Sequence, residues 1–167
     1  LNTILGYSNI PEMRKRPYAV NKRQLLSAYS NLAISAEAIG KDLATSYYRK
    51  FMNLLKAYPE SASAAPEYEL YYTSSNYYLG IKDYKKFIEF SDSLINFSKQ
   101  IPLYKEHVIA YVSAKAAAYD SLRMYKEAYE TSKEYAVLLD TLRMQELRKK
   151  MENLEIEKGA NELVIDK

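Results

Sequence analysis

The chain of 167 residues has no cysteine, no tryptophan, one histidine, four glycines and five prolines. Without cysteine it has no disulfide framework, no thiolate metal site and no cysteine nucleophile. The single histidine, His107, excludes a metal site with two histidine ligands. An all-β protein needs a turn about every 8–12 residues, and so few glycines and prolines argue against one. These absences leave a mostly helical protein without an obvious reaction centre.

Long apolar runs and a strong excess of one charge are also missing. No run of about 18 apolar residues occurs, so we predict no membrane span and no membrane contact within the chain. The net charge is only +3, because 24 Lys and Arg are mixed with 21 Asp and Glu. The densest basic runs, 14–16 and 148–150, are short. A nucleic-acid binder concentrates basic charge on one face, so we interpret these runs as solvated surface and expect no nucleic-acid partner.

Apolar residues recur with the period of an α-helix along most of the chain. One stripe has steps of 4, 4, 3, 1 and 3 before Pro59 ends it; it consists of Leu43, Tyr47, Phe51, Leu54, Leu55 and Tyr58. Gly40 separates this stripe from an earlier one, formed by Leu25, Tyr29, Leu32, Ala33 and Ala36. We predict further helices over about 67–79, 84–99, 105–119 and 125–139. The sequence therefore indicates an all-α fold.

The later helices form a repeat. The segment 81–88 (IKDYKKFI) matches 122–129 (LRMYKEAY), so Tyr84 and Tyr125 occupy equivalent places in successive units. With Ala44 at the equivalent place in an earlier unit, the preceding interval has nearly the same length. A period near 40 that contains two helices is typical of an α-solenoid, in which each hairpin buries its apolar face against the next.

These units resemble tetratricopeptide repeats (TPRs). The family pattern has a large residue near position 4, small at 8, large at 11, Tyr or Phe at 17, and small residues at 20 and 27. The second unit has Tyr71, Ser75, Tyr78, Tyr84, Phe87 and Leu94 at these positions, and the third has Val112, Ala116, Tyr119, Tyr125, Ala128 and Tyr135. Lys82 and Arg123 replace the usual glycine at position 15. The resemblance implies a TPR-like α-solenoid of about three hairpins within a domain over 1–140, of which 1–18 cannot be assigned.

The segment 141–167 is predicted to be a separate C-terminal helix. Met144, Leu147, Met151 and Leu154 follow one another at steps of 3, 4 and 3, the heptad spacing of a two-helix seam. Fewer than two heptads are visible before Lys158 and Asn161 occupy the next core positions. Two interpretations remain open. The helix caps the last repeat, as solenoids require for solubility, or it pairs with a second copy in a homodimer.

The C-terminal order of motifs has a narrower resemblance. The run 125–128, then 135–142, then a helix rich in Glu and Lys, is similar to the end of TPR sensor regions in bacterial (Bacteroidetes-type) membrane-bound histidine kinases and related regulators. This implies a non-catalytic sensor module of a signal-transduction protein, located in the periplasm, with a membrane span and an output domain beyond Lys167. We accordingly expect the chain, which begins at Leu1, to be part of a longer protein. The alternative is a free-standing TPR adaptor or scaffold for protein assembly, which leaves a cytoplasmic location open.

No set of residues predicts catalysis. The four glycines form no nucleophile elbow, P-loop or dinucleotide fingerprint. His107 lies near the start of a predicted helix, without an obvious serine and aspartate partner. The aspartates of 92–94, 120–122 and 140–142 are too far apart to converge in one loop as oxygen ligands do. We expect no enzymatic activity, no cofactor and no metal.

The TPR resemblance also implies a binding groove. In that family the first helix of each hairpin lines a concave surface, through positions near 2, 5, 9 and 12. Carried onto this chain, these include Glu69, Tyr72 and Asn76 of the second unit and Asp120 of the third. Tyr29 joins them if Ala44 stands at position 17. The expected partner is a protein or peptide, and Tyr72 and Asn76 suit it best because a rigid ring with a polar tip and an amide recognise peptides well.

Overall fold

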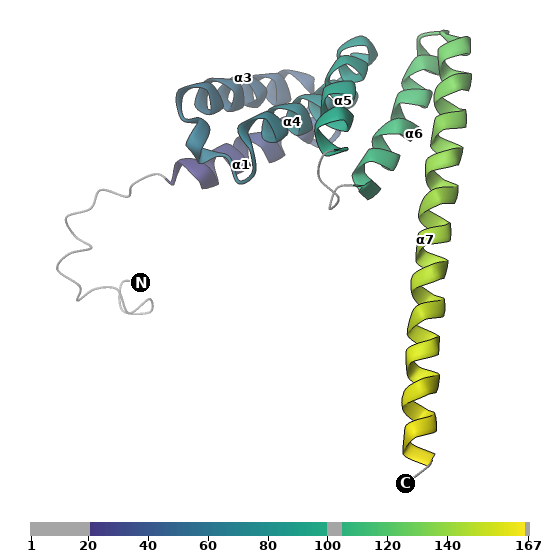
Figure 1. The fold of residues 1–167 in the computed structure, drawn as a ribbon. Helices are drawn as coiled ribbons and strands as arrows, with labels where there is room; N and C mark the ends of the chain where they lie inside the picture. Colours follow the sequence, from purple (N-terminus) through teal and green to yellow (C-terminus); the bar gives the residue numbers. More distant parts are fainter. Residues whose placement is uncertain (1–20, 100–104, 166–167) are drawn as a thin grey trace, which may run out of the picture. The chain divides into compact units, whose positions relative to one another are not determined.

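The computed structural model describes residues 21–99 and 105–165. Within these ranges the only regular elements are helices and there is no strand, which confirms the prediction of an all-α fold (Figure 1). The predictions made for residues 1–18 lie outside the described ranges. The elements are α1 (Lys22–Ile34), α2 (Ala36–Ile39), α3 (Lys41–Ala57), the 3-10 turn η1 (Pro59–Ser61), α4 (Pro66–Gly80), α5 (Tyr84–Ser98), α6 (Lys105–Ser121) and α7 (Tyr125–Ile165).

Two of the helices, α1 and α5, begin at a residue whose side chain caps them. The Asn21 side chain accepts hydrogen bonds from the backbone N–H groups of Arg23 and Gln24, at 3.1 and 3.4 Å. Asp83 accepts from the N–H of Lys86 at 3.3 Å. Such side chains satisfy backbone donors that have no partner within the helix. Gly40 adopts a φ of 86° between α2 and α3, a conformation that glycine adopts without steric cost.

One predicted boundary differs from the structure. The predicted helices over 67–79, 84–99 and 105–119 correspond to α4, α5 and α6 within two residues. The helix predicted over 125–139 does not end there but continues as α7 to Ile165, so position 141 lies inside a helix of 41 residues. No proline or glycine interrupts 125–158, and the good helix formers Leu, Glu, Lys, Arg and Met dominate its second half.

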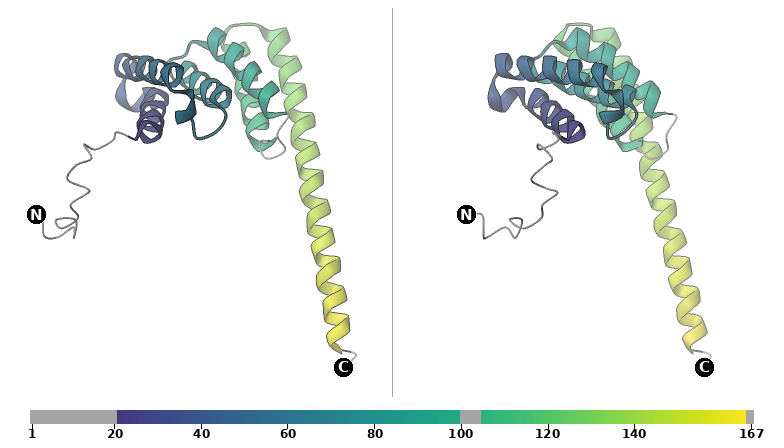
Figure 2. Two further views of the ribbon diagram at one scale, coloured as in Figure 1. Left: turned by 60° about the vertical axis from the view of Figure 1, so that its left-hand side comes forward. Right: turned by 90° about the vertical axis from the view of Figure 1, so that its left-hand side faces the viewer.

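The chain divides into two compact units, residues 1–73 and 74–167, and the division falls within α4. In the first unit α1 and α3 lie side by side (Figure 2). Ala33 and Ala36 of the expected stripe are buried as predicted. The other buried positions of α1 are Leu26 and Ser30, whereas the expected Leu25, Tyr29 and Leu32 are half-buried. Ser30 Oγ shares a hydrogen bond of 2.7 Å with Thr73 Oγ1 of α4, which satisfies two buried hydroxyls.

The buried face of α3 is also offset by one residue at its start. Ala44 and Tyr48 are buried, whereas Leu43 is 48% exposed and Tyr47 is half-buried. Phe51 and Leu55 are buried as expected. The offset has a physical reason, because closely packed helices accept alanine and serine at their contact, and an apolar stripe alone does not identify such positions.

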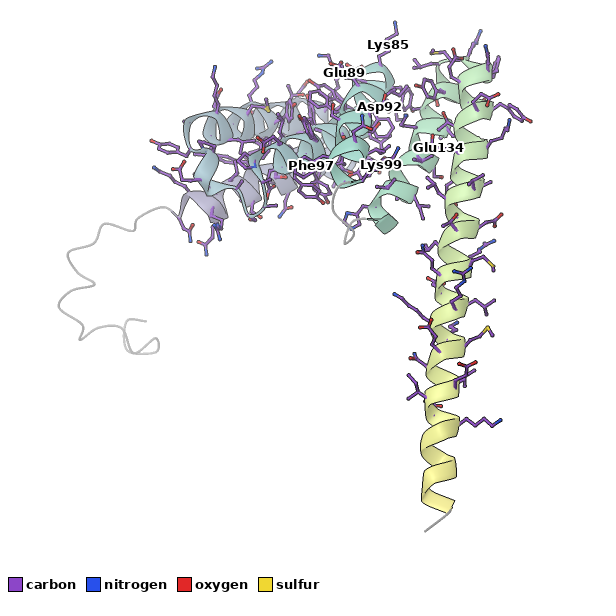
Figure 3. The ribbon with its side chains drawn as sticks, viewed as in Figure 1. Lys85, Glu89, Asp92, Phe97, Lys99 and Glu134 are labelled. Atoms are coloured by element: carbon purple, nitrogen blue, oxygen red, sulfur yellow. The ribbon has the colours of Figure 1, made fainter. Side chains whose placement is uncertain are left out.

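In the second unit α6 packs against both α5 and α7. Tyr78 of α4 stacks on Phe90 of α5, with ring centroids 5.5 Å apart and planes at 15°. Lys115 of α6 forms an ion pair with Asp92 of α5, which is labelled in Figure 3. The buried apolar core of this unit consists of Tyr77, Phe87, Leu94, Ile95, Val108, Tyr111, Val112 and Ala118.

Two turns at equivalent places in the sequence repeat have the same geometry. Between α4 and α5, Lys82 has a φ of 62°, and between α6 and α7 Arg123 has a φ of 59°. The N–H of Asp83 donates to the carbonyl of Tyr78, and that of Met124 to the carbonyl of Tyr119, both at 2.9 Å. Each turn is thus a Schellman motif, with a charged residue where the TPR pattern has glycine.

A second correspondence relates α3 to α5. Both helices contain buried residues at steps of 4, 3 and 4: Ala44, Tyr48, Phe51 and Leu55 in α3, and Phe87, Ser91, Leu94 and Ser98 in α5, where Ile95 is buried in addition. In each case the first of them is the fourth residue of its helix. The structure therefore aligns Ala44 with Phe87, three positions away from the register that placed Ala44 opposite Tyr84.

Candidate functional site

In the first unit, Tyr29 takes part in a contact between α1 and α3. Its ring centroid lies 6.0 Å from that of Tyr47 on α3. Lys50 Nζ lies 5.8 Å from the centroid of Tyr29 and 5.0 Å from that of Tyr47, within the range of cation–π attraction. Tyr29 is half-buried, and the contacts given above are with side chains of α3.

Glu69 and Tyr72 lie on the first half of α4. Glu69 Oε1 accepts a hydrogen bond of 3.1 Å from the backbone N–H of Ser63, which ties the preceding loop to the helix. Tyr72 stacks on Tyr68 one turn earlier, with centroids 5.9 Å apart and planes at 19°. Both rings are half-buried. Each of the two stacked rings is therefore only partly exposed.

In the second unit, Asn76 joins two helices. Its Nδ2 donates a 2.5 Å hydrogen bond to the hydroxyl of Tyr111 on α6. Tyr111 is buried, and the bond from the amide contributes to satisfying its hydroxyl, since a buried hydroxyl is costly without hydrogen bonds. Asp120 is exposed near the end of α6, and its backbone carbonyl accepts from the N–H of Arg123. Of these two predicted groove residues, Asn76 therefore has a clear structural role.

Sequence reasoning missed a hollow among α5, α6 and α7. It has a volume of about 220 Å³, and its lining includes Ser98, Val108, Ile109, Leu138 and Leu142. These residues come from three helices, so no spacing along one helix indicates the hollow. Only the packing of α6 between α5 and α7 brings them together.

The two faces of α7 differ. Thr131 is buried, and Ala128, Tyr135, Leu138 and Leu142 are partly buried on the side that packs against α6. The opposite side carries an exposed apolar stripe, which we call the outer stripe: Tyr129, Val137, Met144, Leu147, Met151 and Leu154. Tyr125, a packing position of the TPR pattern, is also 64% exposed, because no following helix covers it among the described residues.

The predicted seam forms the C-terminal part of the outer stripe. Met144, Leu147, Met151 and Leu154 are between 52% and 64% exposed. Every side chain from Arg143 to Lys158 is exposed, and Figure 3 shows this part of α7 extending past α6. The helix therefore does not fold back over the last hairpin, and its seam does not cap it.

Within 21–99 and 105–165, no group of His, Asp and Glu residues is arranged to hold a metal ion. His107 lies exposed on α6. Over the same ranges no helix combines the length and the apolar character that a bilayer crossing requires. No family model, curated protein or solved structure matches this chain.

Proposed function

We propose that this chain is a non-catalytic protein-interaction module of TPR-like hairpins, which binds a protein or peptide and passes that event through α7 to a domain outside the chain. The C-terminal resemblance leads us to propose the sensor region of a bacterial signal-transduction protein, placed in the periplasm. About 20 apolar codons soon after Lys167, followed by an output domain, would support that setting; a stop codon there would contradict it.

The repeated local geometry supports the TPR-like part of the proposal. The Schellman turns at Lys82 and Arg123 recur at the spacing of the sequence repeat, and each of the four buried positions of α3 has a buried counterpart in α5. Structural repeats of this kind bury their apolar faces against their neighbours and present extended surfaces for partners.

The continuity of α7 is the observation that carries the proposal. The helix begins at Tyr125 inside the last hairpin and ends at Ile165, about 60 Å away at 1.5 Å per residue. Its N-terminal part packs against α6 and its C-terminal part is exposed. A change in how α6 and α7 pack would therefore move the distal end of the same helix.

For the binding surface we favour α4 near Tyr72. The stacked Tyr68 and Tyr72 rings are rigid and amphipathic, and tyrosine supplies large contact area at low entropic cost. The other proposed groove positions are Tyr29, Glu69, Asn76 and Asp120, of which the first three also hold the fold together through the contacts given above.

Panning a display library of short random peptides against the 1–167 chain tests the proposal. We expect enriched peptides whose affinity falls about tenfold or more in Tyr72→Ala, the loss typical of an interface hot spot. Tyr129→Ala is the matched control, because Tyr129 is an exposed tyrosine on α7; we expect it to change affinity less than twofold. Failure to enrich any peptide, or equal effects of both variants, would contradict the proposed surface.

Hydrogen exchange with and without the selected peptide separates the two candidate roles. Transmission predicts that peptide binding changes amide exchange in residues 125–142 of α7. Binding with unchanged exchange there would favour the alternative function, a TPR adaptor or scaffold that assembles proteins without signalling, and would reject the sensor role.

A further inference from the structure

The apolar seam of α7 is bounded by opposite charges. Asp140 precedes it and Lys158 follows it, and each lies nine residues from Lys149, the midpoint between Met144 and Leu154. Eighteen residues are five turns of 3.6 residues, so Asp140 and Lys158 lie on one face of the helix, in line with the seam. Both side chains are exposed.

Parallel pairing with a second copy would bring like charges together. In the heptad that has Met144 and Met151 at a and Leu147 and Leu154 at d, Asp140 is a d residue and Lys158 an a residue. Parallel helices place equivalent a and d residues opposite each other. Asp140 would then face the partner's Asp140, and Lys158 the partner's Lys158. At the flanks, Arg143 would lie near the partner's Arg148, which is a further repulsion. The one attraction among these contacts would be between Lys150 and the partner's Glu155.

In antiparallel pairing centred on Lys149, the contacts of Asp140 and Lys158 with the partner become attractive instead of repulsive. Met144 would then lie opposite the partner's Leu154, and Leu147 opposite the partner's Met151, so all four apolar layers are kept. Asp140 would face the partner's Lys158, and Arg143 the partner's Glu157, and each pair occurs twice by symmetry. Two repulsions remain at the centre, where Arg148 would lie near the partner's Arg148 and Lys150 near the partner's Lys150. Attractive contacts outnumber repulsive ones only in this orientation.

We propose that α7 pairs antiparallel with α7 of a second copy of this chain, centred near Lys149, with Asp140 and Lys158 setting the orientation. The eight seam side chains of two copies, each about half exposed, would bury on the order of 800 Å², which is below the area of stable specific interfaces and within that of weak, transient ones. The dimer is therefore weak and concentration-dependent. This inference does not depend on the proposed peptide binding near Tyr72, since it concerns the helix beyond the hairpin and not what the hairpins bind.

The absence of cysteine allows a direct test of orientation by cross-linking. Met144→Cys and Leu154→Cys chains, distinguished by a size tag, are mixed and treated with a short bifunctional thiol reagent. We expect the 144–154 heterodimer as the main product, because these positions share a layer. Two copies of residue 154 would be about 15 Å apart along the axis, so homodimer products should be minor. Glu146→Cys, exposed but off the seam, is the control and should cross-link little.

Charge reversal gives an independent test by sedimentation equilibrium. We expect Asp140→Lys and Lys158→Asp each to raise the dimer Kd about fivefold, because each places like charges opposite one another at two symmetric points. The double variant D140K/K158D should return Kd to within twofold of the original, since the attraction is restored with its sign exchanged. Lys149→Asp makes the same charge change away from the seam and should have a smaller effect than Lys158→Asp.

Three results would overturn the proposal: homodimer cross-links at both positions without the heterodimer, no rescue in the double variant, or a monomer at all concentrations up to about 500 µM. None of these bears on peptide binding near Tyr72, so the failure of this inference is distinguishable from the failure of the proposed function.

Discussion

Tyrosine makes up 18 of the 167 residues, and its side chain combines a large ring with a hydroxyl that bonds at the edge of a helix contact. Tyr29 contacts Tyr47 in a tilted ring pair, and Tyr78 stacks on Phe90, in each case across two helices. Tyr111 is buried and accepts a hydrogen bond from Asn76. These four tyrosines therefore serve packing between helices.

Tyr111→Phe tests this use of the hydroxyl. The ring is retained and the bond to Asn76 is lost, so we expect the free energy of unfolding to fall by about 1 kcal/mol. Chemical denaturation followed by circular dichroism measures the change. Tyr129→Phe is the matched control, because Tyr129 is exposed; a loss equal to that of Tyr111→Phe would reject a special role for the bond.

The two left-handed turn residues give a second prediction at this scale. Lys82 and Arg123 occupy a region of φ that costs a residue with a Cβ about 1 kcal/mol or more. Lys82→Gly and Arg123→Gly should each raise the free energy of unfolding by about 0.5 kcal/mol, after part of the gain is offset by the entropy of glycine in the unfolded chain.

Thermal or chemical denaturation of each variant measures this gain. Lys85→Gly is the control, since Lys85 is an exposed residue in the first turn of α5 (Figure 3), and glycine inside a helix destabilises it. The prediction is contradicted if both turn variants lower the free energy of unfolding as much as the control does. In that case the lysine and arginine side chains stabilise these turns.

At the scale of the element, α7 contains one segment that packs against another helix and one that does not. Residues up to Leu142 pack against α6, whereas 143–158 have no buried side chain. A helical segment of this length is marginal in water without tertiary contacts. Helix propensity and salt bridges such as Arg143–Asp140, at 4.0 Å, contribute only a few tenths of a kcal/mol each. The stability of the distal segment should therefore depend on a partner.

Amide hydrogen exchange at two protein concentrations tests this dependence. In dilute protein we expect protection to fall sharply after Leu142. At high concentration, protection of 143–158 should rise as the outer stripe becomes covered, while that of 125–142 stays the same. Protection that is uniform along α7 and independent of concentration would contradict a partner-dependent segment.

At the scale of the whole molecule, each of the two units has a fully buried phenylalanine of its own. Phe51 lies on α3 in the first unit and Phe87 on α5 in the second. In repeat proteins, stability is approximately the sum of each repeat and its contacts with neighbours. The loss of either ring should therefore act mainly on its own unit.

Phe51→Ala and Phe87→Ala are reciprocal controls for this expectation. Each should lower the free energy of unfolding by about 3 kcal/mol or more. Hydrogen exchange should accelerate in α1 and α3 for Phe51→Ala, and in α5 and α6 for Phe87→Ala. Equal acceleration throughout both units in both variants would instead indicate a single cooperative core.

Composition, periodicity and the Tyr84–Tyr125 repeat were sufficient to predict an all-α chain and the bounds of α4, α5 and α6, because helix signals are local. The apolar stripe of α3 was offset, since Ala44 and Leu43 are equally acceptable to a helix and differ only in what packs against them. The seam residues were also found from spacing alone. Spacing alone could not tell whether these residues cap the hairpin or face outward.

The amino-acid sequence by itself determined the helices and their repeated turns, because these depend on residue type and neighbours along the chain. It also excluded disulfides and metal sites with two histidine ligands, since there is no cysteine and only one histidine. Only the tertiary structure decided that Asn76 bonds to Tyr111, that Ala44 corresponds to Phe87, and that α7 continues past the hairpin with its outer stripe exposed. Those facts depend on which helices approach one another, and burial is a property of that approach rather than of any one segment.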